Sequence, residues 1–260
     1  MANKIMKDML DEILKEAIEA RSKLKKRKGI LVNNLRSPKS GLFLENYANC
    51  LLNRQLDIFD DSLFLLRNER FQSACIVSRG MVETHAFARF LNKKIEKILV
   101  NEQGKDSAAK ALDLVIKFTN SSRFKKEEQR KIKDGVFDPQ DYMFTEQAKH
   151  RFENMLSFSQ HVVEALKEMY QDEKEQAQRN ESQFEMLYDV LSEYVHPSQT
   201  SIFHYYTPET HHIPTSMGTI HLYESAKQQC VQALHFIVDS KNIYKWSLDL
   251  AAEMTKRNEQ

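Results

Sequence analysis

The chain has 260 residues, of which 41% are hydrophobic and 29% are charged, and it carries a formal net charge of +1. This composition is typical of a soluble globular protein and excludes an intrinsically disordered chain. Because the charge is nearly balanced, no global field recruits nucleic acid or membrane, and an anionic partner would have to meet a local basic patch.

The hydrophobic spacing along the chain predicts an all-α helical bundle. An amphipathic helix over 3–28 ends in the basic run RSKLKKRKG and, with its connector, forms an expected N-terminal helical extension over 1–42. We interpret the basic run as a solvated helix end, and contact with nucleic acid or with a partner protein through this helix is the alternative. The bundle domain is expected over 43–260, with helices over 43–67, 71–97, 107–120, 141–178, 181–196 and 223–256.

The segment before the last helix differs in composition from the rest of the chain. It holds three of the five prolines, and its β-prone residues at 202–206 and 219–223 predict a small β-hairpin or ordered flap near 200–222. It also holds four of the nine histidines: His204, His211, His212 and His221. Their spacing matches none of the strong zinc patterns, so we expect no metal and no cofactor, with a histidine metal site as the alternative.

The cysteines and the apolar runs bear on the compartment. Cys50, Cys75 and Cys230 are far apart and odd in number, which argues against a disulfide framework or a cysteine metal site. Each lies in an apolar helical context, so we interpret each as a small core residue. No apolar run reaches the ~18 residues of a membrane span, so we expect a cytoplasmic protein without a membrane partner.

The helix over 71–97 carries a charged pair within an apolar setting. Arg79 and Glu83 are four residues apart and therefore share a face with core-like residues such as Cys75 and Phe90. Buried charges are costly unless they are paired, so we predict a buried ion pair in the core.

A second polar pattern lies in the helix over 181–196. Tyr188, Ser192 and His196 are spaced four apart and form one stripe. We expect this stripe to face Arg79 and Glu83, with Tyr188 or Ser192 bonded to the glutamate and His196 paired with it. The cluster is either a hydrogen-bond network that clamps two helices or part of a functional pocket.

These two stretches carry a family resemblance. FQSACIVSRGMVE, followed about a hundred residues later by YDVLSEYVHPS, resembles a family of uncharacterised bacterial helical proteins over roughly residues 45–200. That family is distantly similar to HEPN-type helical bundles, many of which are metal-independent RNA-cutting toxins or defence proteins. The resemblance implies a HEPN-like bundle, and we expect a homodimer with RNA as a candidate partner.

HEPN nucleases carry an arginine followed, after four to six residues, by a histidine, and Arg79 and His85 fit that spacing. Six positions along a regular helix correspond to about 240° of rotation, so the two side chains should face different sides. They would converge only at a helix break, for which Gly80 is a weak point, or across a dimer. The simpler interpretation is an exposed His85 beside a structural Arg79.

The first functional hypothesis is therefore a metal-independent endoribonuclease of a toxin or anti-phage defence system. A ribose 2′-hydroxyl would attack its own phosphate while His85 or His196 moves the proton. Arg79 would stabilise the phosphate charge, and Glu83 would orient the arginine or the histidine. Ser192 completes the candidate catalytic set.

The second hypothesis is a non-catalytic binding or assembly module, in which the polar network fixes the packing of the bundle. Under either hypothesis Tyr188, Tyr194 and Tyr205 are the candidate binding residues. The aromatic residues of the flap would stack on a base or pack on the bundle, and packing is the preferred interpretation.

Overall fold

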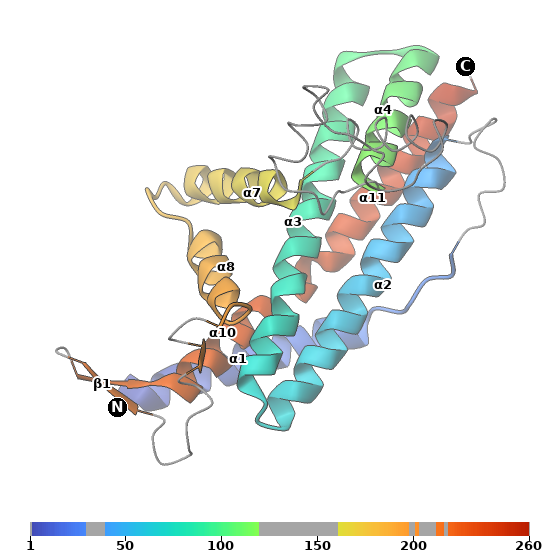
Figure 1. Cartoon of the computed structure of the whole chain (residues 1–260). Helices are drawn as coiled ribbons and strands as arrows, with labels where there is room; N and C mark the ends of the chain where they lie inside the picture. The colour runs from blue at the N-terminus through green and yellow to red at the C-terminus, as the bar shows by residue number, and fades with distance from the viewer. Residues whose placement is uncertain are drawn as a thin grey trace, which may run out of the picture.

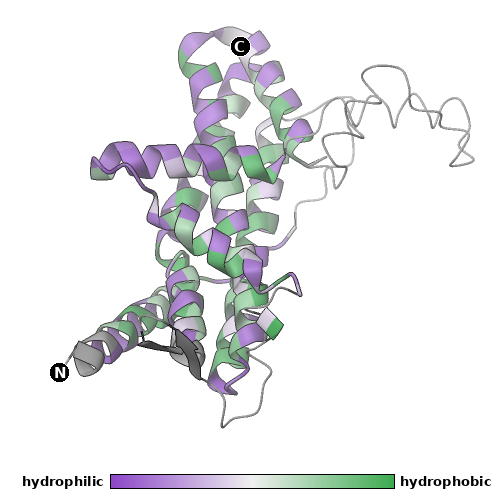
Figure 2. Ribbon diagram, turned by 60° about the vertical axis from the view of Figure 1, so that its left-hand side comes forward, coloured by the Kyte–Doolittle hydropathy of each residue, from purple (hydrophilic) through white to green (hydrophobic). Residues whose placement is uncertain are grey.

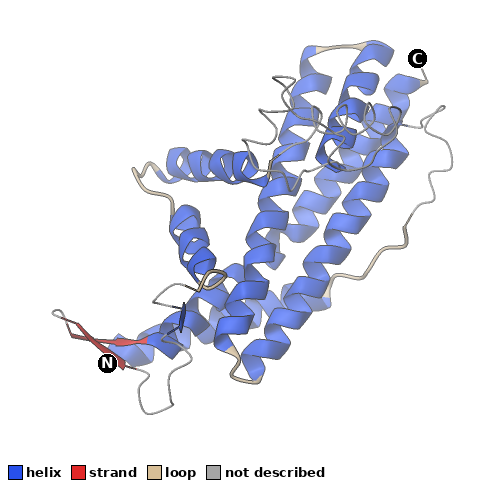
Figure 3. Ribbon diagram, in the orientation of Figure 1, coloured by secondary structure: helices blue, strands red, loops and turns tan. Residues whose placement is uncertain are grey.

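The computed structural model describes residues 2–29, 40–119, 161–197, 201–202, 212–215 and 218–259, and every structural statement below concerns these residues. The fold is all-α, as the hydrophobic spacing predicts, and helices form almost all of its regular structure (Figure 3). Within these ranges no helix is long and apolar enough to cross a bilayer.

Long helices lie side by side and form the body of the molecule (Figure 1). They are α2 (Ser40–Arg67), α3 (Phe71–Asn101) and α11 (Ile237–Asn258), and α4 (Gly104–Thr119) packs against all of them. Each long helix carries both hydrophilic and hydrophobic residues (Figure 2), as an amphipathic helix requires. The bundle therefore buries one face of each helix.

Most of the enclosed side chains between these helices are apolar. Burying each large one contributes roughly 1.5–3 kcal/mol to stability. The largest of them include Leu44, Leu56 and Phe59 of α2, Met81, Leu91 and Ile95 of α3, Phe118 of α4 and Met254 of α11.

A tight turn and a close helix contact determine how the helices meet. The joint between α2 and α3 reverses the chain at Glu69, whose φ is 57°, and Arg70 N donates to Leu65 O at 2.9 Å. At the start of α2, Gly41 lies so close to α11 that a Cβ there would clash with the backbone oxygen of Ala251. A larger residue at position 41 would therefore push α2 away from α11.

The N-terminal helix α1 (Ala2–Ser22) packs against α10 and α11, and its Ala17 is fully buried in the common core. The helix ends before the predicted residue 28. Beyond its end the chain is bound to α2, where Asn53 accepts from Arg27 N and donates to Arg27 O, both at 2.8 Å. The basic run thus lies along α2, where Lys26 pairs with Asp57.

Two shorter helices, α7 (Val162–Ala177) and α8 (Gln183–Glu193), meet at an angle beside α3 (Figure 1). The turn between them is held by Glu173, whose carboxylate accepts from Ser182 Oγ and from two backbone amides. Ser182 in turn caps α8 by accepting from Glu185 N at 3.0 Å. The first part of the helix predicted over 141–178 lies outside the described residues.

The last predicted helix is two helices, α10 (Leu222–Leu234) and α11, with a break at His235 and Phe236. No glycine or proline marks this break in the sequence. The side chain of Phe236 packs edge-on against His85 and lies 5.1 Å from the ring of Phe184. Tertiary packing therefore accompanies the break that helical periodicity did not predict.

The expected flap is described only in part. Strands β1 (His212–Thr215) and β2 (Gly218–His221) pair antiparallel, with Ile213 opposite Ile220. Ile202, predicted to begin a strand, is helical. Residues 203–211 lie outside the described residues, and with them the predicted binding residue Tyr205 and two of the flap histidines.

Candidate functional site

Arg79, Glu83 and Tyr188 form a closed polar triangle between α3 and α8, which we call the Arg79 cluster. Arg79 Nη2 donates to Tyr188 OH at 2.6 Å and lies 3.0 Å from Glu83 Oε1, and the hydroxyl of Tyr188 donates to the same oxygen at 3.0 Å. The guanidinium also lies over the Tyr188 ring, 4.8 Å from its centroid. The predicted contact of Tyr188 with the charged pair is present.

The pair is less buried than we predicted. The side chains of Arg79 and Glu83 are 23% and 26% exposed, and the neighbouring Ile76 is exposed as well. The hydrogen bonds of α8 to this pair come from Tyr188, and they leave both charged side chains partly exposed. Burial and the charge of Glu83 raise the pKa of Tyr188, so its hydroxyl keeps the proton that it donates.

The rest of the predicted stripe does not join the cluster. Ser192 Oγ donates to the carbonyl of Tyr188 at 2.7 Å, a bond within its own helix, and not to Glu83. His196 lies beyond the end of α8 with an exposed side chain, and no hydrogen bond joins its imidazole to Glu83. Tyr194, a predicted binding residue, is buried in the core.

His85 is buried, which corrects the expectation of an exposed side chain. Its ring packs edge-on against Phe236 with centroids 4.7 Å apart, and its Nε2 lies 4.0 Å from Asp239 Oδ2. Burial lowers the pKa of His85 to about 3, and the nearby Arg89 lowers it further, so the imidazole is neutral at pH 7. Arg79 and His85 have separate partners, as the rotation of the helix predicts.

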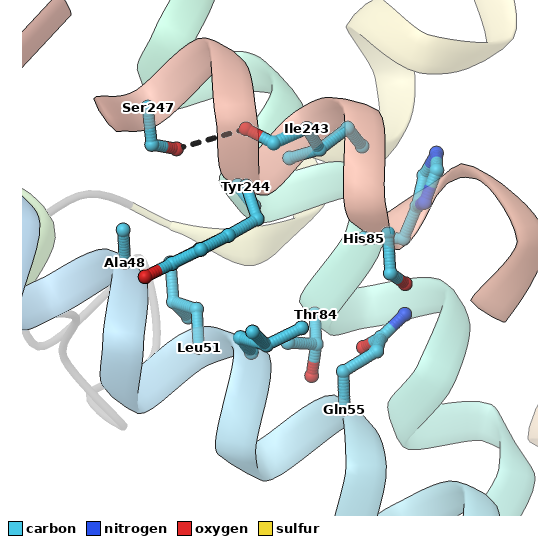
Figure 4. A pocket seen from close by; sticks show the side chains of 11 residues that line it. Ala48, Leu51, Gln55, Thr84, His85, Ile243, Tyr244 and Ser247 are labelled. Atoms are coloured by element: carbon cyan, nitrogen blue, oxygen red, sulfur yellow. Dashed lines mark hydrogen bonds between the residues drawn. The ribbon is translucent and has the colours of Figure 1, made fainter. Parts of the chain in front are cut away.

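A small cavity lies between α2, α3 and α11 (Figure 4). Gln55, Thr84 and His85 line one end of it, and Tyr244 and Ser247 line the other. Its volume of about 30 Å³ is enough for an ordered water molecule. Gln55 Oε1 and His85 Nδ1 are both buried without a hydrogen-bond partner in the described structure.

A much larger cleft, of about 750 Å³, opens on the other side of His85, between α7, α8, α10 and the start of α11. We call it the α7–α8 cleft. Its apolar wall includes Leu187 and Val190 of α8 together with Phe236. Amide side chains line much of the remainder: Gln176, Gln183, Gln228, Gln229 and Gln232.

No local pattern in the sequence predicts this cleft, because its walls come from segments far apart in the chain. The glutamines of α10 and Asp239 were not among the candidate residues. Most charges that line the cleft are already engaged: Arg89 Nη2 lies 3.2 Å from Asp172, and Lys93 Nζ lies 2.8 Å from the same carboxylate. His235 Nε2 lies 3.1 Å from Glu16.

Possible metal ligands and the three cysteine thiols can be examined within the part of the chain that the structure describes. Among its residues no group of three histidine, cysteine or acidic side chains could hold a metal ion. Cys75 and Cys230 are buried, as predicted, and burial raises the pKa of each thiol, that of Cys230 to about 12. Cys50 is exposed, so its interpretation as a core residue was wrong.

Residues 45–213 match a protein family described as a family of unknown function, DUF5677. Searches of curated proteins and of solved structures each found no match. The matched span covers well over half of the chain and includes both helices of the Arg79 cluster, so the chain belongs to this family. The distant similarity to HEPN-type domains stays a prediction.

Proposed function

We propose that this member of the DUF5677 family is a non-catalytic binding module whose α7–α8 cleft holds a ligand. The observation that carries the proposal is the cleft itself. Its volume of about 750 Å³ falls within the range of about 300–1,000 Å³ that is typical of ligand sites. Its lining combines apolar side chains with uncharged amides, a mixture that both buries and orients a bound molecule.

The Arg79 cluster supports this proposal as a positioning device. Tyr188 lies one residue after Leu187, which lines the cleft, so the bonds of its hydroxyl hold α8 against α3. The guanidinium of Arg79 is already engaged by a carboxylate and a phenol and is stacked on the ring. In this role the cluster fixes one wall of the cleft.

A screen of a fragment library by ligand-observed NMR tests the proposal. Val190 lines the cleft, and Val190→Trp would fill part of it. Val100→Trp, at an exposed position of α3, is the matched control. We expect fragments that bind the wild type and the control but lose binding in Val190→Trp. A set of fragments that binds all three proteins equally, or none of them, would refute the cleft as the binding site.

Ribonuclease activity is the second candidate. The observation in its favour is that the side chains of Arg79 and His196 both reach solvent. Arg79 lies on α3 and contacts Tyr188 of α8, and His196 lies just beyond the end of α8. RNA as a partner and a homodimer belong to this proposal. The neutral, buried His85 supports it less, because a group with so low a pKa is a weak base.

A growth assay separates the two candidates. Wild type, Arg79→Ala and His196→Ala are induced in cells, with and without phage challenge, and total RNA is analysed. The binding proposal expects intact RNA in every strain. RNA cleavage that wild type causes and both variants abolish would establish the nuclease instead.

A further inference from the structure

We infer that the ligand of the α7–α8 cleft is a small organic cation, an amine on an apolar body, whose ammonium group pairs with Asp239. This inference rests on the proposed binding function and names the chemistry of its ligand. It is carried by the charges of the cleft, by a neutral imidazole next to its free carboxylate, and by the aromatic rings beside them.

Two carboxylates of the cleft, Glu173 and Asp239, have no lysine or arginine partner in the described chain, and Asp239 accepts fewer hydrogen bonds. Its Oδ1 accepts from Asn242 Nδ2 at 3.1 Å, its side chain is 45% exposed, and no lysine or arginine of the described chain pairs with it. The other acids of the cleft are occupied: Asp172 by Arg89 and Lys93, and Glu173 by the cap of α8. An incoming cation would therefore meet its free charge at Asp239.

His85 stands next to this carboxylate as a neutral group. Its side chain is only 6% exposed, its Nε2 lies 4.0 Å from Asp239 Oδ2, and its Nδ1 has no hydrogen-bond partner. Because the low pKa keeps the imidazole uncharged, it does not repel a bound ammonium group.

The rings of Phe184 and Phe236 complete the site. They lie 5.1 Å apart and line the cleft together with His85, which contacts Phe236 edge-on. Aromatic faces attract cations, and the apolar wall that continues to Val190 would bury the body of the ligand. An anionic ligand would find Arg89 Nη2 already bonded to Asp172, and the unpartnered Nε of Arg89 is buried.

Isothermal titration of the full chain with 2-phenylethylammonium at neutral pH tests the inference, with uncharged 2-phenylethanol and anionic 3-phenylpropanoate as comparison probes. We expect the cation to bind most tightly. Asp239→Asn should weaken it by about tenfold or more, because a charge-assisted hydrogen bond is lost. Asp249→Asn, at an exposed position of the same helix, is the matched control and should leave the affinity unchanged.

The outcomes separate the two proposals. Tighter binding of the alcohol or the carboxylate, lost in Val190→Trp, would refute the cationic ligand and leave the binding function standing. Equal affinity of wild type and Asp239→Asn for the cation would also refute it. If none of the three probes binds, the inference falls, while the fragment screen decides the binding function independently.

Discussion

On the α8 side of α3, Arg79, Glu83 and Tyr188 bond one another at an edge that is partly open to water, and Arg79 Nε is buried without a hydrogen-bond partner. On the α10–α11 side, His85 is enclosed, neutral and left with an unpartnered nitrogen between two cavities. The charged pair that looks most reactive in the sequence is thus bonded within its own cluster and to Tyr188. His85, by contrast, lies beside a cleft that has room for a ligand.

The largest expected effect concerns the buried side. The folded pKa of His85 is about 3, whereas an unfolded histidine titrates near ~6.5. As the pH falls below ~6.5 the unfolded chain takes up the proton first, so stability is progressively lost towards pH 3. Between the two pKa values, the unfolding free energy falls by ~1.4 kcal/mol for each pH unit. We therefore expect a loss of about 2 kcal/mol at pH 5.

Urea unfolding of wild type and His85→Phe at pH 7 and pH 5 measures this contribution. The difference in unfolding free energy between the two pH values should be about 2 kcal/mol smaller in the variant. His196→Phe, which changes an exposed imidazole, should keep the wild-type difference. An unchanged pH dependence in His85→Phe would show that His85 is not held neutral, and the contrast between the two sides of α3 would disappear.

A smaller effect is expected on the open side. Glu83→Ala removes the carboxylate that accepts from both Arg79 and Tyr188, and we expect a loss of about 1–2 kcal/mol in unfolding free energy. A fully buried pair would lose about 3–5 kcal/mol. The control Glu96→Ala, at an exposed position of the same helix, should stay within ~0.5 kcal/mol of the wild type. A loss as small as that of the control would mean that the cluster does not hold α8.

The smallest expected effect tests whether Ser192 belongs to the Arg79 cluster. Ser192 Oγ bonds only a carbonyl of its own helix, so Ser192→Ala should change the unfolding free energy by less than ~0.5 kcal/mol. Thermal unfolding followed by circular dichroism is sufficient to test this. A loss comparable to that of Glu83→Ala would return Ser192 to the cluster, as the spacing of the stripe predicts.

The sequence was informative where one helix carries the signal. Spacing by four placed Tyr188 on the face that meets Arg79 and Glu83, and the rotation between Arg79 and His85 separated their environments. Spacing failed for His196, because α8 ends at Glu193 and the periodicity no longer applies beyond it.

Features that are built from several segments of the chain could not be predicted from helical spacing. The burial of His85 depends on Phe236, at a helix break without glycine or proline. The α7–α8 cleft draws on segments from Ile13 to Asp239, and no local pattern reports such a convergence. The prediction that Ser192 bonds Glu83 failed for a different reason. A serine in a helix can donate to the carbonyl four residues back as readily as to a neighbouring helix.

The contact of Gly41 with α11 bears on how the chain can be divided. The family match ends at residue 213, before α10 and α11, yet α11 closes against the start of α2 and its Ile243 carbonyl accepts from the buried Asn92 of α3. A fragment trimmed to the matched span would expose the faces of α2 and α3 that α11 covers. The smallest autonomous folding unit therefore has to include the C-terminal helix, and a truncation designed from the family boundaries alone should aggregate.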